Sequence, residues 1–297
     1  MSAARSIVLR PSAKVNLTLR VGPLRADGFH DIRTLMQSIA LNDTLTISPR
    51  RGPFKFDTRA PGVPTDRTNL VWRAATILWR SLKRAGDPRD VHVRLEKQIP
   101  SAAGLGGGSA DAAAALAGLN VAWEGRRSRA DLMTMAAELG SDVPFFFQGG
   151  TALASGRGEE IYPVDDVTRF GMVIIKPSFG VATPDAYRWL DEDRAGGEAA
   201  QATPARVDLG WPSGPVALEN DLQAPVARRQ PAVVEMIEAC QRAGARAAAM
   251  TGSGSAVFGI FTEGSARAAA ARLARPDWLV LLTRTLTRQE AARRLGL

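Results

Sequence analysis

The segment with the clearest chemical signature in this chain is rich in glycine. Residues 100–111 read PSAAGLGGGSAD, and four of the five residues from Gly104 to Gly108 are glycine. Glycine loses much conformational entropy on folding, so such a cluster indicates that something must approach the backbone closely. An alternating segment precedes the glycines and an alanine-rich segment follows them. A strand, a glycine loop and a helix in this order favour a phosphate-binding site, because backbone N–H groups and the helix dipole attract anions.

Two better-known glycine loops do not fit this segment. A P-loop requires a lysine directly after its glycines, whereas Ser109 follows Gly108 here. The dinucleotide fingerprint G-x-G-x-x-G requires a third glycine at a position that this spacing gives to Ser109. A flexible linker is a further alternative, but linkers seldom lie between a clear strand and a strong helix. A phosphate cradle outside these two classes is therefore the favoured interpretation.

Two charged residues could act on a bound phosphate compound. Asp142 lies between Gly140 and Pro144 in a predicted turn, where its carboxylate could project into a cleft and accept a proton. From the residues alone, a helix N-cap is an equally good interpretation of Asp142. Lys14 lies in an alternating segment, where a solvated strand residue is a more common finding than a catalytic cation. Asn16 is two residues further on and so lies on the same face of that strand.

The elements that must position these residues follow from apolar periodicity. Helices are expected at residues 69–84, 111–124, 128–139, 230–243 and 265–273. Strands are expected at residues 7–9, 15–21, 38–48, 91–95, 170–175 and 278–283, with a glycine turn and a strand within 247–261. Strands and helices mix without the regular alternation of a doubly wound sheet, so we predict an α+β protein of two lobes.

The boundary between the two lobes is expected near residues 156–162, which gives domains at 1–158 and 159–297. Residues 195–214 are rich in Ala, Gly, Pro and Gln with little periodicity, and they are predicted to be a loop without an assigned role.

Composition excludes several classes of protein. The chain has 297 residues, a net charge of +8, one cysteine and two histidines, so an intrachain disulfide is impossible and a structural zinc site is strongly disfavoured. Its Lys and Arg residues are scattered, which favours small anionic ligands over nucleic acid. No apolar run is long enough for a signal peptide or a membrane span. We therefore expect a cytoplasmic protein that binds neither membranes nor nucleic acid.

Three segments occur in an order that resembles the GHMP kinase superfamily. They are PSAKVNLTL at 11–19, PSAAGLGGGSADAAAAL at 100–116 and MTGSGSAVFGIF at 250–261. The resemblance covers essentially the whole chain. It implies a two-lobed fold with an N-terminal nucleotide-binding lobe and a C-terminal ferredoxin-like lobe, and it implies an enzyme that uses ATP and Mg²⁺.

Three further segments resemble one branch of this superfamily, the 4-diphosphocytidyl-2-C-methyl-D-erythritol kinase family. They are DGFH at 27–30, NLVWRAA at 69–75 and GSDVPFF at 140–146. This resemblance implies ATP-dependent phosphorylation of the 2-hydroxyl of 4-diphosphocytidyl-2-C-methyl-D-erythritol, in the non-mevalonate route to isoprenoid precursors. The alternatives are a homoserine or mevalonate type of kinase, a catalytically inactive nucleotide-binding regulator and an RNA-binding protein. The DGFH segment argues against the first of these, since neither substrate offers a cytosine to stack.

The resemblance also implies roles for individual residues. Asp142 would be the base that takes the proton of the acceptor hydroxyl, paired with Lys14. The implied nucleotide-binding residues are Asn69, Lys97, Pro100, Ser101, Ala102, Ala103, Gly104, Leu105, Gly106, Gly107, Gly108, Ser109 and Ala110. The implied substrate-binding residues are Asn16, Phe29, His30, Asp142, Thr183 and Tyr187. Phe29 stands where the family commonly has tyrosine. Phenylalanine keeps the stacking ring but lacks the hydroxyl. No residue is assigned as a metal ligand, and a monomer or weak homodimer is expected.

Overall fold

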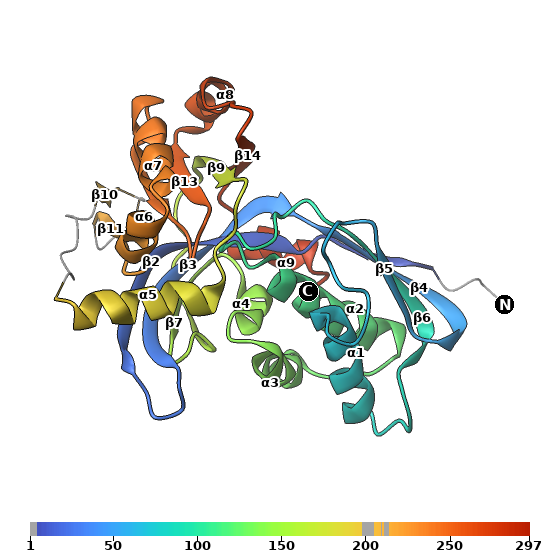
Figure 1. The fold of residues 1–297 in the computed structure, drawn as a ribbon. Helices are drawn as coiled ribbons and strands as arrows, with labels where there is room; N and C mark the ends of the chain where they lie inside the picture. The colour runs from blue at the N-terminus through green and yellow to red at the C-terminus, as the bar shows by residue number, and fades with distance from the viewer. Residues whose placement is uncertain (1–4, 198–204, 209, 211–213) are drawn as a thin grey trace.

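The structure is a computed structural model that describes residues 5–197, 205–208, 210 and 214–297. The described residues form three sheets, and the first lies at one end of the molecule (Figure 1). Its order is β1-β4-β6-β5, from strands β1 (Ile7–Leu9), β4 (Thr44–Pro53), β6 (Arg89–Glu96) and β5 (Lys55–Thr58). Helices α1 (Leu70–Ser81), α2 (Gly107–Ala122), α3 (Arg129–Leu139) and α4 (Val143–Gln148) gather beside this sheet.

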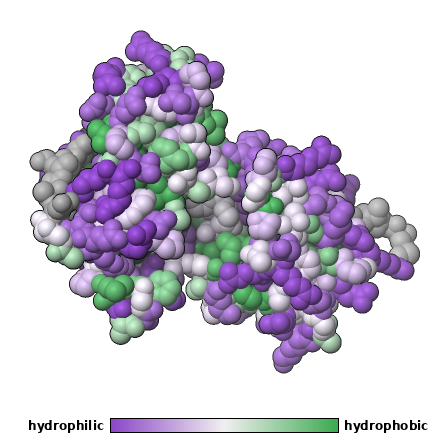
Figure 2. Space-filling model, in the orientation of Figure 1, coloured by the Kyte–Doolittle hydropathy of each residue, from purple (hydrophilic) through white to green (hydrophobic). Residues whose placement is uncertain are grey.

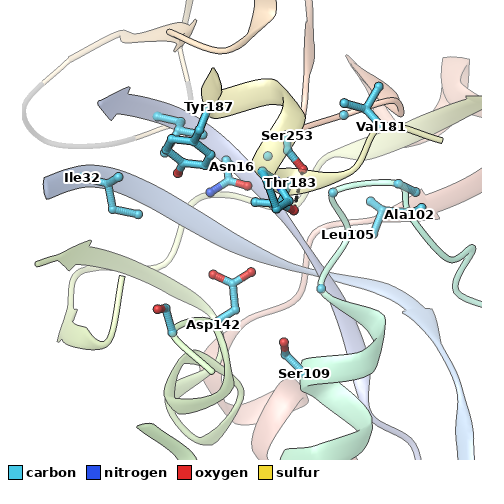
Figure 3. Close-up of a pocket in the computed structure, with 18 of the residues that line it drawn as sticks. Asn16, Ile32, Ala102, Leu105, Ser109, Asp142, Val181, Thr183, Tyr187 and Ser253 are labelled. Carbon is cyan, nitrogen blue, oxygen red and sulfur yellow. Dashed lines mark hydrogen bonds between the residues drawn. The ribbon is translucent and has the colours of Figure 1, made fainter. Parts of the chain in front are cut away.

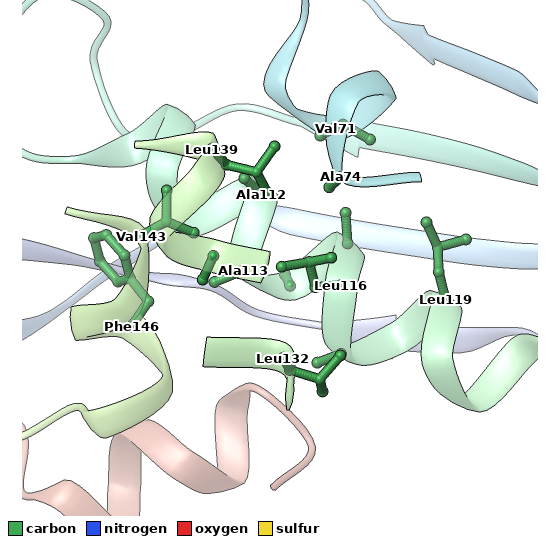
Figure 4. Packing of buried hydrophobic residues seen from close by; sticks show 14 of the residues in the cluster. Val71, Ala74, Ala112, Ala113, Leu116, Leu119, Leu132, Leu139, Val143 and Phe146 are labelled. Atoms are coloured by element: carbon green, nitrogen blue, oxygen red, sulfur yellow. The ribbon is translucent and has the colours of Figure 1, made fainter. Parts of the chain in front are cut away.

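Helix α2 is the centre of the N-terminal core. Alanine is its commonest residue, which favours helix and lets neighbouring elements pack closely around it. Figure 4 shows Ala112, Ala113, Leu116 and Leu119 of α2 among apolar side chains of α1, α3 and α4. Because α2 is buried on nearly all sides, the glycine loop that precedes it is carried on a rigid support.

The second sheet runs through the middle of the molecule. Its order is β10-β11-β2-β3-β7-β8, from strands β10 (Ala205–Val207), β11 (Val216–Asn220), β2 (Ser12–Leu24), β3 (His30–Asn42), β7 (Thr151–Ser155) and β8 (Glu160–Pro163). The long hairpin of β2 and β3 is antiparallel, with register shifts near Lys14 and Asn16. Strand β11 pairs in parallel with β2, so this sheet joins both halves of the sequence.

The third sheet lies in the C-terminal half and is antiparallel. Its order is β12-β13-β9-β14, from strands β12 (Ala247–Met250), β13 (Val257–Phe261), β9 (Gly171–Pro177) and β14 (Trp278–Arg284). The remaining helices are α5 (Thr183–Ala195), α6 (Gln223–Arg229), α7 (Ala232–Arg242), α8 (Glu263–Arg272) and α9 (Arg288–Arg294). Figure 2 shows that the surface is hollowed between the side that carries α5 and the side that carries α3 and α4.

Three of the sequence-based expectations need correction. The strand expected at 38–48 is two strands, because the buried carboxylate of Asp43 turns away to accept hydrogen bonds from the Gln98 and Ile99 amides. Helix α2 begins at Gly107 rather than Asp111, since the last two glycines of the loop already have helical backbone. Within the segment predicted to be a loop, residues 205–207 form strand β10. The rest of that predicted loop lies partly outside the described residues.

The boundary expected near residues 156–162 stays a prediction. The second sheet crosses it through β11, and α9 at the C-terminus contacts α4 of the N-terminal half.

Candidate active site

The predicted functional residues meet in one cleft of about 990 Å³. Strand β2, the glycine loop, residues 252–254, helix α5 and the start of α4 all contribute to its lining. In Figure 3, Asp142 and Ser109 point into this space from one side, while Asn16, Thr183 and Tyr187 lie across from them. The cleft includes all of the predicted site residues except Asn69 and Ala110, which are not among the described lining residues.

The close neighbours of the glycine loop require glycine at two of its positions. Gly104 has a φ of +73°, and a Cβ there would collide with the carbonyl oxygen of Thr251. Gly106 has a φ of +70°, and a Cβ there would stand 2.8 Å from the ring of Phe146. The third motif, residues 250–261, therefore lies directly against the loop. The glycines allow this contact and keep the first turn of α2 on the wall of the cleft.

Lys14 and Asp142 form an ion pair at the centre of the cleft. The Lys14 Nζ atom lies 3.4 Å from Asp142 Oδ2 and donates to Asn16 Oδ1 at 2.7 Å. The Lys14 side chain is 4% exposed and that of Asp142 is 35% exposed, so the carboxylate is the partner that a ligand can reach. Asp142 stands at the N-cap position of α4, but its side chain makes no capping hydrogen bond within the described structure. The carboxylate is therefore available to a group bound in the cleft.

Asn16 is held by polar partners on two sides. Its Nδ2 atom donates to Thr34 Oγ1 at 2.7 Å, and its backbone N–H donates to Thr251 Oγ1 at 3.0 Å. Thr34 is on β3 and Thr251 follows β12, so these bonds fix Asn16 between the central sheet and the third motif. With its amide oxygen bound to Lys14, Asn16 orients the lysine rather than standing alone.

The other predicted nucleotide-binding residues fall into three groups. Residues 100–109 line the cleft continuously, and Lys97 lies just beneath them. Asn69 is the N-cap of α1, where its Oδ1 accepts from the Val71 N–H and its Nδ2 donates to the Pro64 carbonyl. Ala110 is buried in α2. The roles suggested for Asn69 and Ala110 stay predictions.

The far end of the cleft presents two aromatic rings and a histidine. Phe29 is half-exposed, with the Arg157 guanidinium 5.0 Å from its ring centroid. His30 is buried and stacks on Tyr187, with ring centroids 5.3 Å apart. Burial, helped by the charge of Asp142, raises the pKa of the Tyr187 hydroxyl to about 12, so this group stays protonated and can donate. Flat rings next to polar groups suit an aromatic base.

His30 is fixed at both ring nitrogens. Its Nδ1 atom lies 2.9 Å from the Gly22 carbonyl oxygen, which can only accept, so Nδ1 carries a hydrogen. Its Nε2 atom lies 3.2 Å from Asp191 Oδ2 on α5. Thr183, at the start of α5, places its hydroxyl 3.1 Å from that of Ser253 (Figure 3). Helix α5 therefore ties the Phe29–His30 end of the cleft to the third motif.

Several residues of the site were not assigned from the sequence. Ser253 lines the cleft, and Asp111 accepts a hydrogen bond from Lys97, which lines it. Both lie inside the glycine-rich segments, so their position in the sequence could have pointed to them. Arg157 and Asp191 lie in segments without any motif, and only the tertiary structure brings them to Phe29 and His30.

The described residues contain no group of three or more His, Cys, Asp or Glu side chains arranged to hold a metal ion. No helix among them is long and apolar enough to cross a bilayer.

The fold and this site define a GHMP kinase. The model of the GHMP kinases N terminal domain matches residues 69–150, and that of the GHMP kinases C terminal region matches residues 208–276. Solved structures of more distant relatives share the fold, among them homoserine kinase from Cytophaga hutchinsonii, with a TM-score of 0.67 and 17% identity over 98% of both chains. The chain is therefore a kinase, and the predicted α+β two-lobed fold is confirmed.

Within this class, the chain belongs to the 4-diphosphocytidyl-2-C-methyl-D-erythritol kinase family. A protein of that name from Anaeromyxobacter dehalogenans (strain 2CP-C) is 48% identical over 90% of this chain and 84% of its own length. One from Pelotomaculum thermopropionicum is 44% identical over 92% of this chain and 96% of its own length. A crystal structure of 4-(cytidine 5'-diphospho)-2C-methyl-D-erythritol kinase superposes with a TM-score of 0.75 at 32% identity, covering 94% of this chain and 99% of that one.

Proposed function

We propose that this chain transfers the γ-phosphoryl group of ATP to the 2-hydroxyl of 4-diphosphocytidyl-2-C-methyl-D-erythritol, a step in making isoprenoid precursors. The observation that carries the proposal is that the Lys14–Asp142 pair lies in one cleft with the glycine loop and with the Phe29–His30 end. The names of the close relatives support the reaction and its substrate.

The glycine loop is the proposed site for the phosphates of ATP. Helix α2 has 16 residues and begins at Gly107, so its first N–H groups have no partner within the helix. They face the cleft together with the Ser109 hydroxyl, and an anion there also meets the positive end of the helix dipole. Lys14 lies against Gly106, which supports a role for its ammonium group close to the transferred phosphoryl.

Mg²⁺ fits this cleft as a companion of the nucleotide. Magnesium in kinase sites is held by one or two carboxylates together with phosphate oxygens, and the described residues offer no carboxylate cluster that could hold it by themselves. When bound, the ion neutralises part of the phosphate charge. The remaining steps depend on side chains of this chain.

Asp142 is the proposed general base. As the acceptor oxygen attacks the γ-phosphorus and ADP leaves, the hydroxyl proton passes to the Asp142 carboxylate. Lys14 orients this carboxylate before the reaction and stabilises charge on the phosphoryl group during it. The half-exposed carboxylate and the buried ammonium suit these two tasks, since only the base has to touch the acceptor.

The cytosine is proposed to lie at the Phe29 end. The ring of Phe29 provides a stacking surface, while His30 and Tyr187 provide polar atoms and a second ring. A homoserine or mevalonate substrate would leave these rings without a partner. An inactive regulator would have no need of the Lys14–Asp142 pair. A monomer or weak homodimer in the cytoplasm, free of nucleic acid, remains part of the proposal.

A panel of acceptors tests the proposal. The protein is incubated with Mg-ATP and, in turn, the cytidyl substrate, homoserine, mevalonate, galactose and no acceptor, and ADP release is measured. We expect release well above the acceptor-free background with the cytidyl substrate alone. Comparable release with homoserine or mevalonate would contradict the assignment of the Phe29 end.

A further inference from the structure

A buried cluster of three charged residues lies behind the glycine loop. Lys97, just after β6, donates to Asp43 Oδ2 and, at 2.8 Å, to Asp111 Oδ2. Asp43 lies between β3 and β4, and Asp111 is in α2. Asp43 is 0% exposed and Asp111 is 3% exposed. Two buried carboxylates thus share one ammonium group.

The two carboxylates differ in the number of hydrogen-bond donors that reach them. Both oxygens of Asp43 are bound: Oδ1 accepts from the Gln98 and Ile99 amides at 2.6 and 2.8 Å, and Oδ2 accepts from Lys97. Asp111 Oδ1 is buried and has no hydrogen-bond partner among the described residues. A carboxylate with fewer donors holds its negative charge less well, so a proton shared by this pair resides on Asp111.

The electrostatic surroundings agree with this assignment. Burial, reinforced by the negative charge of Asp43 and opposed by Lys97, raises the pKa of Asp111 to about 8. Among the described residues, Lys97 and Asp43 are the charged groups that act on it. With the proton in place, the cluster carries one negative and one positive charge and is neutral. Without it, the cluster has a net charge of −1.

The cluster lies next to the proposed nucleotide site. Lys97 lines the cleft, and a Cβ on Gly107 would stand 3.1 Å from its Nζ atom. The ammonium group therefore supports the first turn of α2, whose N–H groups are the proposed phosphate ligands. A change of charge in the cluster would act on a bound polyanion over a short distance with little water between them.

We propose that Asp43 and Asp111 are positioning residues that hold Lys97 beneath the nucleotide, and that Asp111 does so in its protonated, neutral form. The proposal rests on the nucleotide site of the proposed function. It has a direct consequence: when Asp111 loses its proton, the added negative charge repels the phosphates. Nucleotide affinity therefore falls as the solution pH rises past the point where Asp111 ionises.

The same proton links folding stability to pH. The native state retains a proton that the unfolded chain releases near its ordinary aspartate pKa, because the pKa of Asp111 is raised in the folded protein. This contribution to stability is complete below the unfolded-state pKa. It is lost progressively as pH rises from about 4 to about 8. The asparagine variant at this position lacks this pH dependence.

The test compares Asp111→Asn with the unchanged protein. Asparagine mimics the neutral acid in shape and charge, so its ADP affinity at about pH 7 should stay within about twofold. ADP dissociation constants are measured by calorimetry from about pH 7 to about pH 9.5. The unchanged protein should lose affinity by on the order of fivefold, the effect of one charge at short range, and Asp111→Asn should not. The matched control is Asp87→Asn, which removes an exposed carboxylate paired with Arg67 and should follow the unchanged protein.

Two results would overturn the proposal. One is a parallel loss of ADP affinity with pH in Asp111→Asn and in the unchanged protein. The other is a loss of more than about tenfold in that variant at neutral pH, which would mean that Asp111 is ionised in the native state.

A measurement on the unchanged protein decides the matter if the variant does not fold. In protein labelled with ¹³C at aspartate carboxyl groups, one resonance should titrate well above pH 7. If every aspartate titrates in the ordinary acidic range, the proposal is wrong. ADP binding needs no acceptor alcohol, so failure of the cytidyl substrate in turnover assays would leave this test intact.

Discussion

At the residue scale, Lys14 and Asp142 differ in burial, and this difference suits the two roles proposed for them. The lysine is almost completely enclosed, and an enclosed ammonium group requires acceptors, which Asn16 and Asp142 supply. The aspartate keeps about a third of its side chain open to the cleft. A substrate hydroxyl can therefore reach the carboxylate while the ammonium group stays in place.

Asp142→Asn should retain the fold and nucleotide affinity while losing most turnover. The change is nearly isosteric, and Lys14 keeps its bond to Asn16, so the main loss is basicity. A positioned general base contributes about 10²- to 10⁴-fold, and we expect kcat to fall by on the order of 10² or more. Steady-state kinetics and ADP calorimetry on the same variant separate the two effects. A kcat close to that of the unchanged protein would exclude Asp142 as the base.

Phe29→Ala should raise KM for the cytidyl substrate and leave KM for ATP nearly unchanged. Loss of an aromatic stack costs about 1–3 kcal/mol, which corresponds to about one to two decades in affinity. Phe29→Tyr is the matched control: it keeps the ring over which Arg157 lies and should be mild. If Phe29→Ala harms ATP binding and spares the cytidyl substrate, the cytosine does not lie at this end of the cleft.

At the scale of elements, the site depends on two turns that are far apart in the sequence. Gly104 of the glycine loop and Gly252 of the third motif approach so closely that a Cβ on Gly252 would stand 3.0 Å from the Gly104 carbonyl oxygen. Thr251 bonds to Asn16 from the same turn. The loop, strand β2 and the third motif thus fix one another.

Gly107→Val tests the loop. Gly107 is in the first turn of α2 with ordinary helical backbone, so the harm comes from crowding: a Cβ there would stand 2.9 Å from the Ile99 side chain and 3.1 Å from Lys97 Nζ. We expect KM for ATP to rise at least tenfold, with a much smaller change for the cytidyl substrate. Gly264→Val is the control, since no described atom beyond its chain neighbours and its own helix backbone lies within 4 Å of its Cβ position. Equal weakening of both ligands would argue against a nucleotide site at this loop.

Apolar periodicity predicted the elements whose packing follows one regular face. The alternation of β6 and the helical spacing of α1 were visible because each element packs with one regular face. The break at Asp43 was not visible, since its cause is a pair of amides more than fifty residues later. For the same reason Asp191 was missed: nothing near it in the sequence points to His30. Motif residues were found because their chemistry and their position in the chain coincide.

At the scale of the whole molecule, the C-terminal helix α9 packs against the N-terminal half of the chain. Helix α9 returns to the N-terminal half, where the Arg294 carbonyl accepts from the Arg10 N–H at 2.8 Å and Leu295 is buried in the core around α2. Glu290 forms the capping box of α9 with Thr287 and also pairs with Arg284. Residues of and after α9 therefore support the core that carries the proposed nucleotide site.

Glu290→Gln should lower the free energy of unfolding by about 1 kcal/mol at neutral pH, because glutamine can still cap the helix but loses the ion pair. Hydrogen bonding from Arg284 lowers the pKa of Glu290 to about 2. The stabilisation is therefore present above the unfolded-state pKa and is lost as pH falls toward 2. Denaturant unfolding at several pH values measures it. Glu238→Gln, which removes an exposed ion pair on α7, is the control. An equal loss of unfolding free energy in that variant would contradict a specific stabilising role of Glu290.

The identity of the product is the most direct test of the proposed reaction. Phosphorus NMR and mass spectrometry are applied after the protein has reacted with Mg-ATP and the cytidyl substrate. We expect one new phosphomonoester on the acceptor's 2-hydroxyl, an intact diphosphate bridge and ADP in equal amount, with almost no product from Asp142→Asn. A product phosphorylated elsewhere, or ADP formed without any phosphorylated acceptor, would contradict it.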